Sequence, residues 1–388
     1  MDIKITKTSI IYALFFLLIL FCCFQNVIIY NFNGQFSFKM SHFISLLFLP
    51  FLLSERKIKI PPTILNLFFM FVIFVSLTIG LKYSINNLIL NYISGFYYLV
   101  LFLTLGCRFG EKTWLKMIKT ISWIVITFIL IKLVINIDVI ISFLRNPYNH
   151  PVIETFFGGG VNLEATWVAL LGFSFYKDKK GYLYWLLSLI ISSIYASRVG
   201  IMASCFLFIY LYFSNKKTNL KAFLKTLFSV VFIGIIGLII LNKLGMYDYL
   251  LERFLNIGSE SGSLGRLRMW NYVFESFKNN PFGYGIGNSL VAIELSSGLY
   301  FTENNLHNLF LQMLLELGIV GFLFYMILII YFVIKNRAKL LSDPIISFIF
   351  IYIVLSLFQF RGGDSLLFCF LGLYLIRISR RRELEKKL

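Results

Sequence analysis

The chain of 388 residues is at once very hydrophobic and strongly basic. Hydrophobic residues make up 59% of it and charged residues only 14%, with a formal net charge of +18 and a mean hydropathy of +0.83. Soluble globular proteins carry about 25% charged residues, so this composition excludes a soluble domain and indicates a protein that crosses a membrane repeatedly. An excess of positive charge can also attract nucleic acid, but here its distribution along the chain indicates membrane topology, and no nucleic-acid partner is expected.

Twelve apolar segments follow one another along the chain, several of them near the 17–25 residues that a spanning helix needs. The second is short and contains Pro50. The sequence therefore predicts an all-α integral membrane protein with about 12 transmembrane helices in a single polytopic domain over residues 1–388. The approximate bounds of the segments are 8–30, 41–54, 60–80, 87–106, 114–135, 161–176, 181–196, 199–214, 222–241, 307–334, 344–360 and 365–377.

Lysine and arginine residues favour one side of this arrangement. If the N-terminus lies in the cytoplasm and the segments alternate, most of the 36 lysines and arginines fall on the cytoplasmic side. Cytoplasmic loops of membrane proteins carry such an excess of basic residues. The distribution therefore predicts that both termini are cytoplasmic.

One connection is much longer than a connector needs. Residues 242–306 form a large outer loop between the ninth and tenth predicted helices, and long loops of this kind are commonly functional. Within the loop, apolar residues at helical spacing predict a short amphipathic helix that lies on the outer leaflet. Its apolar face is formed by Leu267, Trp270, Val273, Phe274 and Phe277.

Polar residues are dense in four short motifs, which contrast with the apolar remainder of the chain. Polar side chains at membrane depth cost free energy, so they are interpreted as functional. In chain order the motifs are Ser197-Arg198-x-Gly200, Gly265-Arg266-x-x-x-Trp270, Pro281-x-Gly283-x-Gly285-x-Gly287 and His307-Asn308-x-x-Leu311-Gln312-x-x-x-Glu316-x-Gly318.

The four motifs, in this order, resemble the superfamily of O-antigen polymerases and ligases (Wzy/WaaL type). The resemblance covers Ser197 to Tyr325. It implies a GT-C-like glycosyltransferase in the inner membrane of a Gram-negative bacterium, with the active site facing the periplasm. The implied donor is an oligosaccharide linked to undecaprenyl pyrophosphate, and the transfer inverts the anomeric configuration without a metal or another cofactor. Membrane lipid and the chain-length regulator and flippase of the same pathway are the implied partners.

The resemblance also selects the catalytic residues Arg198, Arg266 and His307. Two arginines in bidentate contact would bind the pyrophosphate and stabilise the charge that develops on it. His307 would orient or deprotonate the acceptor hydroxyl. The alternative for His307 is a helix cap or a surface residue.

The position of Arg198 is also informative without the resemblance. It is the only charged residue between Lys180 and Lys216, and it lies midway between two spans that are slightly shorter than the hydrocarbon core is thick. It should therefore lie at the depth of the lipid phosphates. The alternative to pyrophosphate binding is an arginine that snorkels to ordinary headgroups.

Two further groups near Arg266 are candidates for binding the donor. Arg268 lies about 200° around the predicted helix from Arg266, so both cannot face one ligand equally, and the alternative for Arg268 is a solvated loop charge. Gly283, Gly285 and Gly287 could present backbone amides to a phosphate, although this spacing is more often simply a turn.

The remaining candidates are polar residues at the outer ends of spans. Asn304, Asn308, Gln312 and Glu316 recur every four residues and predict one polar stripe that descends into the bilayer beside His307. We expect Asn308 and Gln312 to contact the substrate and Glu316 to be structural.

Two loops add weaker candidates for contacting the glycan. They are Arg361 in the last outer hairpin, whose alternative is a pair with Asp364, and Glu164, near Asn162 at the outer end of the sixth span. No metal site is expected, because the three histidines and five cysteines show no ligand spacing.

The motifs are shared by polymerases and ligases, and three functions are compared. The short interval from Pro281 to His307 leaves little structure to dock a bulky lipid A–core, which favours a polymerase that extends a lipid-linked repeat unit. A ligase that transfers the glycan to lipid A–core is the alternative. A transporter for lipid-linked glycans is the alternative from another class, but transporters place ionisable residues near the midplane and show repeated halves.

Overall fold

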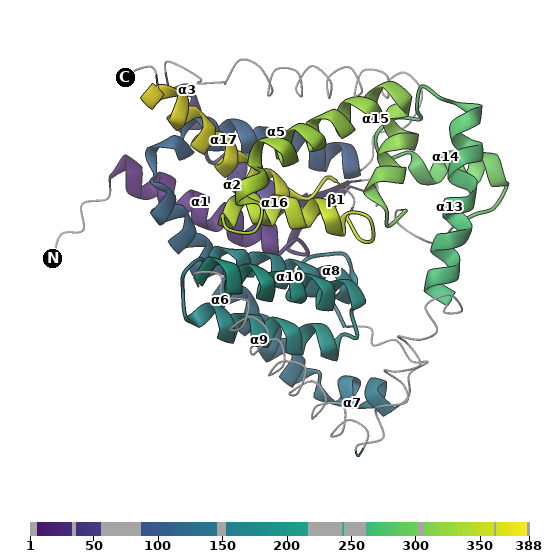
Figure 1. Ribbon diagram of the computed structural model, residues 1–388, viewed down its shortest axis with the longest axis horizontal. Coiled ribbons are helices and arrows are strands. Elements are labelled where there is room, and N and C mark those ends of the chain that lie inside the picture. The colour runs from purple at the N-terminus through teal and green to yellow at the C-terminus, as the bar shows by residue number, and fades with distance from the viewer. Residues whose placement is uncertain are drawn as a thin grey trace.

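The computed structural model describes residues 6–32, 36–55, 87–145, 153–215, 243, 261–301, 306–360 and 362–385. Within these residues the protein is mostly helical (Figure 1). Three of the described helices are long and apolar enough to cross a membrane, namely Ile89–Arg108, Glu111–Ile135 and Leu309–Lys339. A mostly helical protein is thus confirmed, and it has three described helices that are capable of spanning a membrane by their length and composition. The spans predicted at 60–80 and 222–241 lie outside the described residues, so the total of about 12 stays a prediction.

Most of the described helices coincide with predicted spans. These are α1 (Lys7–Cys23), α5 (Asn87–Thr104), α6 (Glu111–Ile135), α8 (Gly160–Leu171), α9 (Lys180–Ile194), α10 (Arg198–Asn215), α15 (Leu309–Asn336), α16 (Pro344–Leu355) and α17 (Ser365–Glu385). The predicted outer connections contain α7 (Ile137–Arg145), α13 (Ser261–Asn279) and α14 (Ser289–Ser297).

The first two predicted spans need correction. The first is helical only to Cys23 and is followed by a hairpin of two antiparallel strands, β1 (Ile28–Phe32) and β2 (Phe36–Lys39). The isoleucines and aromatic residues of this segment favour extended structure, so the fold is not purely α-helical. The second span is divided into α2 (Met40–Leu46) and α3 (Leu49–Leu53), because Pro50 has no amide proton to continue a helix from α2.

Aromatic side chains hold the bundle together. Phe15 of α1, Phe102 of α5 and Trp114 of α6 meet with ring centroids 5.0–5.1 Å apart. Trp167 of α8 lies 5.8 Å from the ring of Tyr352 of α16. These rings are fully buried, and contacts of this geometry add to the burial of apolar area.

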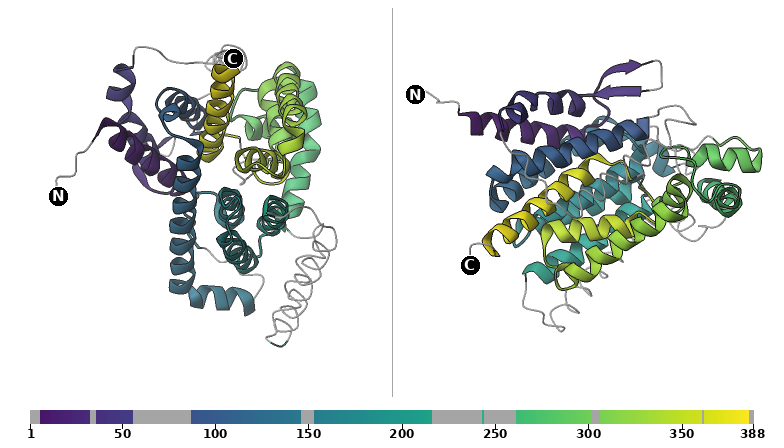
Figure 2. Two further views of the ribbon diagram at one scale, coloured as in Figure 1. Left: turned by 60° about the vertical axis from the view of Figure 1, so that its left-hand side comes forward. Right: turned by 90° about the horizontal axis from the view of Figure 1, so that it is seen from above.

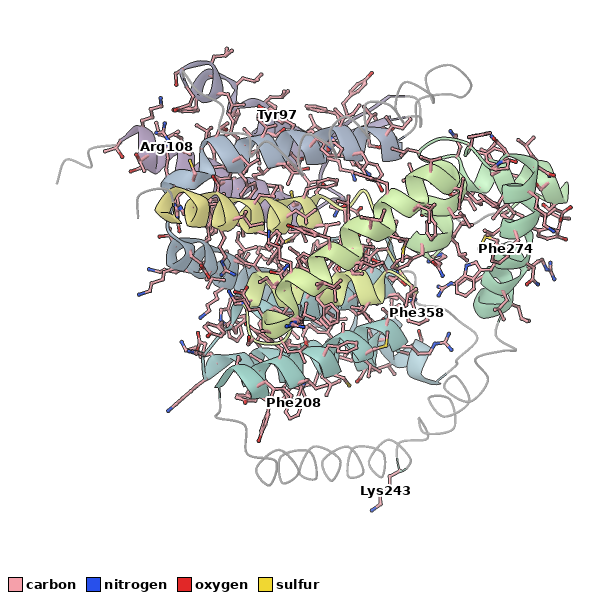
Figure 3. All side chains as sticks on the ribbon, turned by 45° about the horizontal axis from the view of Figure 1, so that its top comes forward. Tyr97, Arg108, Phe208, Lys243, Phe274 and Phe358 are labelled. Carbon is pink, nitrogen blue, oxygen red and sulfur yellow. The ribbon has the colours of Figure 1, made fainter. Side chains whose placement is uncertain are left out.

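The two ends of the bundle differ in character. At one end, where α1 begins and α17 ends, charged side chains pair with one another: Arg108 with Glu55, and Arg377 with both Glu111 and Asp343. At the other end lie α13 and α14, and α13 runs across the direction of the bundle helices (Figures 1 and 2). Figure 3 shows Arg108 and Phe274 at these opposite ends.

The α13–α14 end has an apolar core of its own, which we call the second core. It contains Met269 and Val273 of α13, Ile293 of α14 and Leu306 and Leu315 around the start of α15. The predicted apolar face of α13 is therefore divided. Part of it is turned inward to this core, whereas Leu267 and Phe274 are 46% and 60% exposed.

The long helix α15 is broken at Gly318, which has φ 65° and ψ −174°. The break releases peptide groups that a continuous helix would pair, and in a membrane such groups must find partners within the protein. The loop before α14 supplies those partners. Three backbone hydrogen bonds join the two segments: Tyr284 N to Leu315 O (2.8 Å), Gly285 N to Glu316 O (2.9 Å) and Ile319 N to Pro281 O (2.9 Å).

Only glycine allows the two backbones to approach this closely. A Cβ atom on Gly318 would lie 2.3 Å from the carbonyl carbon of Phe282, and one on Gly283 would lie 2.6 Å from the amide nitrogen of Gly318. Both glycines also have a positive φ, which disfavours any other residue. The Pro-x-Gly-x-Gly and Glu-x-Gly motifs therefore form one backbone interlock between the loop and α15.

We expect Gly318→Ala to destabilise the protein by more than about 3 kcal/mol, because a backbone clash in a packed interior is among the most costly substitutions. Gly298→Ala is the matched control. Gly298 also has a φ of +65°, but nothing lies near its Cβ position, so its cost should be about 1 kcal/mol from the left-handed backbone alone. Thermal unfolding of the purified protein in detergent measures both, and equal losses would show that the interlock is dispensable.

Candidate active site

His307 lies immediately before α15 in an unusual backbone conformation. Its φ of 54° is in the left-handed region, which is uncommon for a residue with a side chain. Asn308 is the N-cap of the helix, and its side-chain oxygen accepts hydrogen bonds from Phe310 N (3.0 Å) and Leu311 N (3.1 Å). The oxygen of Asn308 therefore fixes the start of α15, and the expected contact of Asn308 with the substrate stays a prediction. The half-buried His307 is thereby held at a defined point.

The residues on both sides of His307 are also anchored. The indole Nε1 of Trp270 donates a hydrogen bond to the carbonyl of Leu306 (2.8 Å), and the amide of Leu309 donates to the carbonyl of Ser356 (2.8 Å). The tryptophan of the Gly-Arg-x-x-x-Trp motif therefore holds the residue that precedes His307. Motifs that are far apart in sequence are physically joined here.

The same helix distinguishes the two arginines of α13. Arg266 lies one helical turn before Trp270, and residues four apart share a face of a helix. Arg266 is half-buried, whereas Arg268 is exposed. Arg266 therefore lies on the face of α13 that contains Trp270, the residue bonded to the segment before His307. Arg268 is directed away from the second core.

The polar stripe of α15 is turned into the protein. Gln312 and Glu316 are 1% and 2% exposed. The Glu316 carboxylate lies near Gln312, Gly287 and Ser289, but within the described residues neither of its oxygens has a hydrogen-bond partner. The structural role expected of Glu316 stays a prediction. Asn304, the first residue of the predicted stripe, lies outside the described residues.

The glycine loop serves the fold. The amide of Gly283 donates to Asn280 O at 3.2 Å and that of Gly285 donates to Glu316 O. These two amides are therefore used within the chain and are not presented to a phosphate. Of the two interpretations given to this loop, the turn is the one that the structure supports.

Arg198 begins α10 directly after a tight turn. In that turn Ala196 has a φ of 45°, and the amide of Gly200 donates to the hydroxyl Oγ of Ser197 (3.1 Å). A Cβ atom on Gly200 would lie 2.6 Å from that of Ala165, so the glycine lets α10 approach α8. Arg198 is half-buried, and helix N-termini favour anions. α10 begins at the end of the bundle where α13 and α14 lie (Figure 1).

Glu164 does not lie where a glycan could contact it. It is fully buried, pairs with Lys132 of α6, and accepts a hydrogen bond from the hydroxyl of Tyr195 (2.6 Å). The expected sugar contact is therefore replaced by a buried polar cluster. Sequence reasoning missed Lys132 and Tyr195, although a lysine within a predicted span is itself a signal for a buried partner.

The last outer hairpin is described only in part. Arg361 lies outside the described residues, so its role and its pairing with Asp364 stay predictions. Asp364 is buried and accepts a hydrogen bond from the hydroxyl of Tyr352 (2.6 Å). Among the described residues, no group of three or more His, Cys, Asp or Glu side chains could hold a metal ion.

Comparison with known protein families gives one informative result. Residues 182–326 match the family model described as O-Antigen ligase (Wzy_C). The matched region runs from α9 through the break in α15, and so includes Arg198, Arg266 and His307 with the contacts described above. No curated protein and no solved structure matches the chain.

We expect Trp270→Phe to loosen the chain around His307, because phenylalanine fills most of the space but cannot donate to Leu306 O. Hydrogen exchange of peptides covering 306–310 should accelerate, and the loss of one partly buried hydrogen bond should cost about 1 kcal/mol. Trp185→Phe is the control, since the Trp185 indole N–H has no acceptor in the part of the chain that the structure describes. Unchanged exchange in Trp270→Phe would show that the indole does not hold this segment.

Proposed function

We propose that this chain is an O-antigen polymerase, because residues 182–326 match the O-Antigen ligase family model and this match supports the O-antigen polymerase/ligase superfamily. Members of the family are glycosyltransferase-like enzymes of polysaccharide assembly. The proposed reaction transfers a growing glycan from undecaprenyl pyrophosphate onto a lipid-linked repeat unit. One observation carries the proposal. Within the matched region, Trp270 joins α13, the helix that contains Arg266, to the residue before His307.

The proposed chemistry is a single displacement at the anomeric carbon. The acceptor hydroxyl oxygen forms the new glycosidic bond while the bond to the pyrophosphate oxygen breaks, and the electron pair leaves with the lipid pyrophosphate. His307 orients the hydroxyl and accepts its proton. Arg198 and Arg266 hold the pyrophosphate and stabilise the charge that it gains. Attack opposite the leaving group inverts the configuration.

The surroundings of each residue support its role. Arg198 stands at the N-terminus of α10, where the helix dipole and the first backbone amides add to its attraction for an anion. Arg266 is partly shielded from water, which strengthens its interaction with a charged ligand. Exposed Arg268 lacks this advantage and stays a secondary candidate. Gln312 is also a secondary candidate, because its side chain is almost fully buried.

The proposed setting is the bacterial inner membrane, with both termini in the cytoplasm and the site facing the periplasm. The paired charges at the end where α1 begins belong to segments that the distribution of lysine and arginine assigns to the cytoplasm. The α13–α14 end carries the candidate catalytic residues and would then contact the periplasm and the lipid-linked oligosaccharide. A chain-length regulator and a flippase of the same pathway are the proposed partners.

The structure between α13 and α15 favours a polymerase over a ligase. Its described residues form the interlocking loop and α14, which pack against the start of α15 and in the second core. Within the described residues, this region holds no additional element that could dock a lipid A–core. A ligase remains the second candidate because the matched family is described by that activity. A transporter is disfavoured because the candidate residues gather at one end of the bundle.

We expect Arg198→Ala and Arg266→Ala each to lower chain extension at least about 100-fold, the loss typical of removing a group that stabilises developing charge. Arg→Lys at either position should restore little activity, because an ammonium group cannot make the bidentate contact. Arg268→Ala is the matched control on the same helix and should keep most activity. Activity is measured as polymer formed per unit of membrane-inserted protein, and wild-type activity in both alanine variants would exclude pyrophosphate binding at these positions.

The polymerase and the ligase are distinguished by the lipopolysaccharide of a deletion strain. Without a polymerase, single repeat units still reach lipid A–core through an intact ligase, so we expect a core-plus-one-repeat band. His307→Ala should reproduce this band at a normal protein level. Bare core, with polymer retained on undecaprenyl pyrophosphate, would identify the protein as the ligase.

A further inference from the structure

A buried ion pair lies behind the turn that carries Arg198 and has no part in the chemistry above. Glu164 of α8 is fully buried, and its Oε1 is shared by Lys132 of α6 and the hydroxyl of Tyr195 at the end of α9 (2.6 Å to the hydroxyl). Its Oε2 accepts a hydrogen bond from the amide of Phe156 (2.5 Å). One carboxylate thereby ties together α6, the loop before α8 and the end of α9. We call Lys132, Glu164 and Tyr195 the carboxylate cluster.

Stability alone does not account for such a cluster. Removing two charges from water costs several kcal/mol, and well-packed apolar residues in place of a buried ion pair are often as stable or more stable. Ionisable groups within membrane segments are rare and usually functional. A buried ion pair whose members are all hydrogen-bonded fixes the local geometry, because any movement that leaves a member unpaired costs free energy.

The geometry that it fixes is the Arg198 turn. Tyr195 is three residues before Arg198, and between them Ala196 adopts a φ of 45°. Such backbone strain persists only where the surroundings impose it. Glu164 holds the turn at Tyr195, and the neighbouring Ala165 packs against Gly200 on its far side. Two consecutive residues of α8, Glu164 and Ala165, therefore contact the chain on both sides of Arg198.

The sign of the charges also matters. Lys132 neutralises Glu164, and its ammonium lies 4.6 Å from the ring centroid of Phe156 and 5.7 Å from that of Tyr195. Glu164 is bonded to Tyr195, which is three residues before Arg198, and without Lys132 its negative charge would compete with an anionic ligand for the guanidinium. With Lys132 in place, the cluster supports the turn without reducing its attraction for an anion.

We propose that Lys132, Glu164 and Tyr195 are positioning residues that set the affinity of Arg198 for the lipid pyrophosphate. The inference rests on the proposed function, because it takes Arg198 as a pyrophosphate ligand. It assigns to the carboxylate cluster no contact with the substrate. Its effect is transmitted through the backbone of residues 195–198.

The test compares two buried tyrosines of α9, each of which donates one hydrogen bond to α8. Tyr195→Phe removes the bond to Glu164, and the control Tyr184→Phe removes the bond from the Tyr184 hydroxyl to Val168 O (2.8 Å). Both should lower the unfolding temperature, Tyr195→Phe by the larger amount because it loses a bond to a charged group. Only Tyr195→Phe should weaken the binding of undecaprenyl pyrophosphate to the purified protein, by up to about tenfold, if part of the free energy of the lost hydrogen bond to a charged group is used to position Arg198. Wild-type affinity in Tyr195→Phe, or an equal loss in both variants, would overturn the inference.

A second pair of variants tests the charge. Lys132→Met should weaken binding more than Tyr195→Phe does, because it leaves Glu164 unneutralised beside the turn. Adding Glu164→Gln to Lys132→Met should recover most of the affinity, since glutamine removes the charge and still accepts from Tyr195. Failure of the double variant to recover affinity while it remains folded would exclude the electrostatic part of the inference.

A comparison of undecaprenyl pyrophosphate binding by the wild-type protein and by Arg198→Ala tests the proposed function separately from this inference. Equal binding of undecaprenyl pyrophosphate by these two proteins would overturn the proposed function itself. Loss of binding in Arg198→Ala together with full binding in Tyr195→Phe would overturn only the role of the carboxylate cluster.

Discussion

The backbone interlock at Gly318 is the constraint on which the arrangement of the site depends. A helix inside a membrane cannot break without leaving peptide groups unpaired, and here the loop from Pro281 to Gly285 takes up those groups. The loop is thereby fixed against α15, and α13 and α14 on its two sides are fixed with it. The close approach requires glycine on both sides, so the dense glycines of this region reflect a backbone contact more than a ligand cradle.

The interlock gives the α13–α14 unit a defined position relative to α15. The second core closes the contact with apolar side chains, and the Trp270 indole extends it to the residue before His307. Arg266 is carried on the same helix as Trp270. The helix that carries Arg266 and the segment that carries His307 are thus joined although they are about 40 residues apart in sequence, and the proposed transfer chemistry needs such preorganisation.

The Arg198 turn is positioned by different means. It is held from the bundle side by Glu164 and Ala165 of α8, through one charged hydrogen bond and one close packing contact. The proposed site therefore draws on two supports, the backbone interlock and the buried ion pair. In both, polar groups are satisfied within the protein at membrane depth, where an unpaired group would be expensive. Arg198, Arg266 and His307, the groups proposed to contact the substrate, lie next to the interlock and the ion pair and are not part of either.

Composition and local pattern determined the class of the protein: the apolar segments located most of the described helices, and the motifs singled out Arg198, Arg266, His307 and the helix that contains Trp270. These features could be predicted because span length, helical periodicity and short motifs are local properties of a chain. The tertiary structure alone decided that Glu164 is paired and buried, that the glycine loop closes a broken helix and that the first span ends in a β-hairpin. Each of these depends on a partner distant in sequence or on competition between local conformations, and such partners are chosen by packing, which local pattern does not encode.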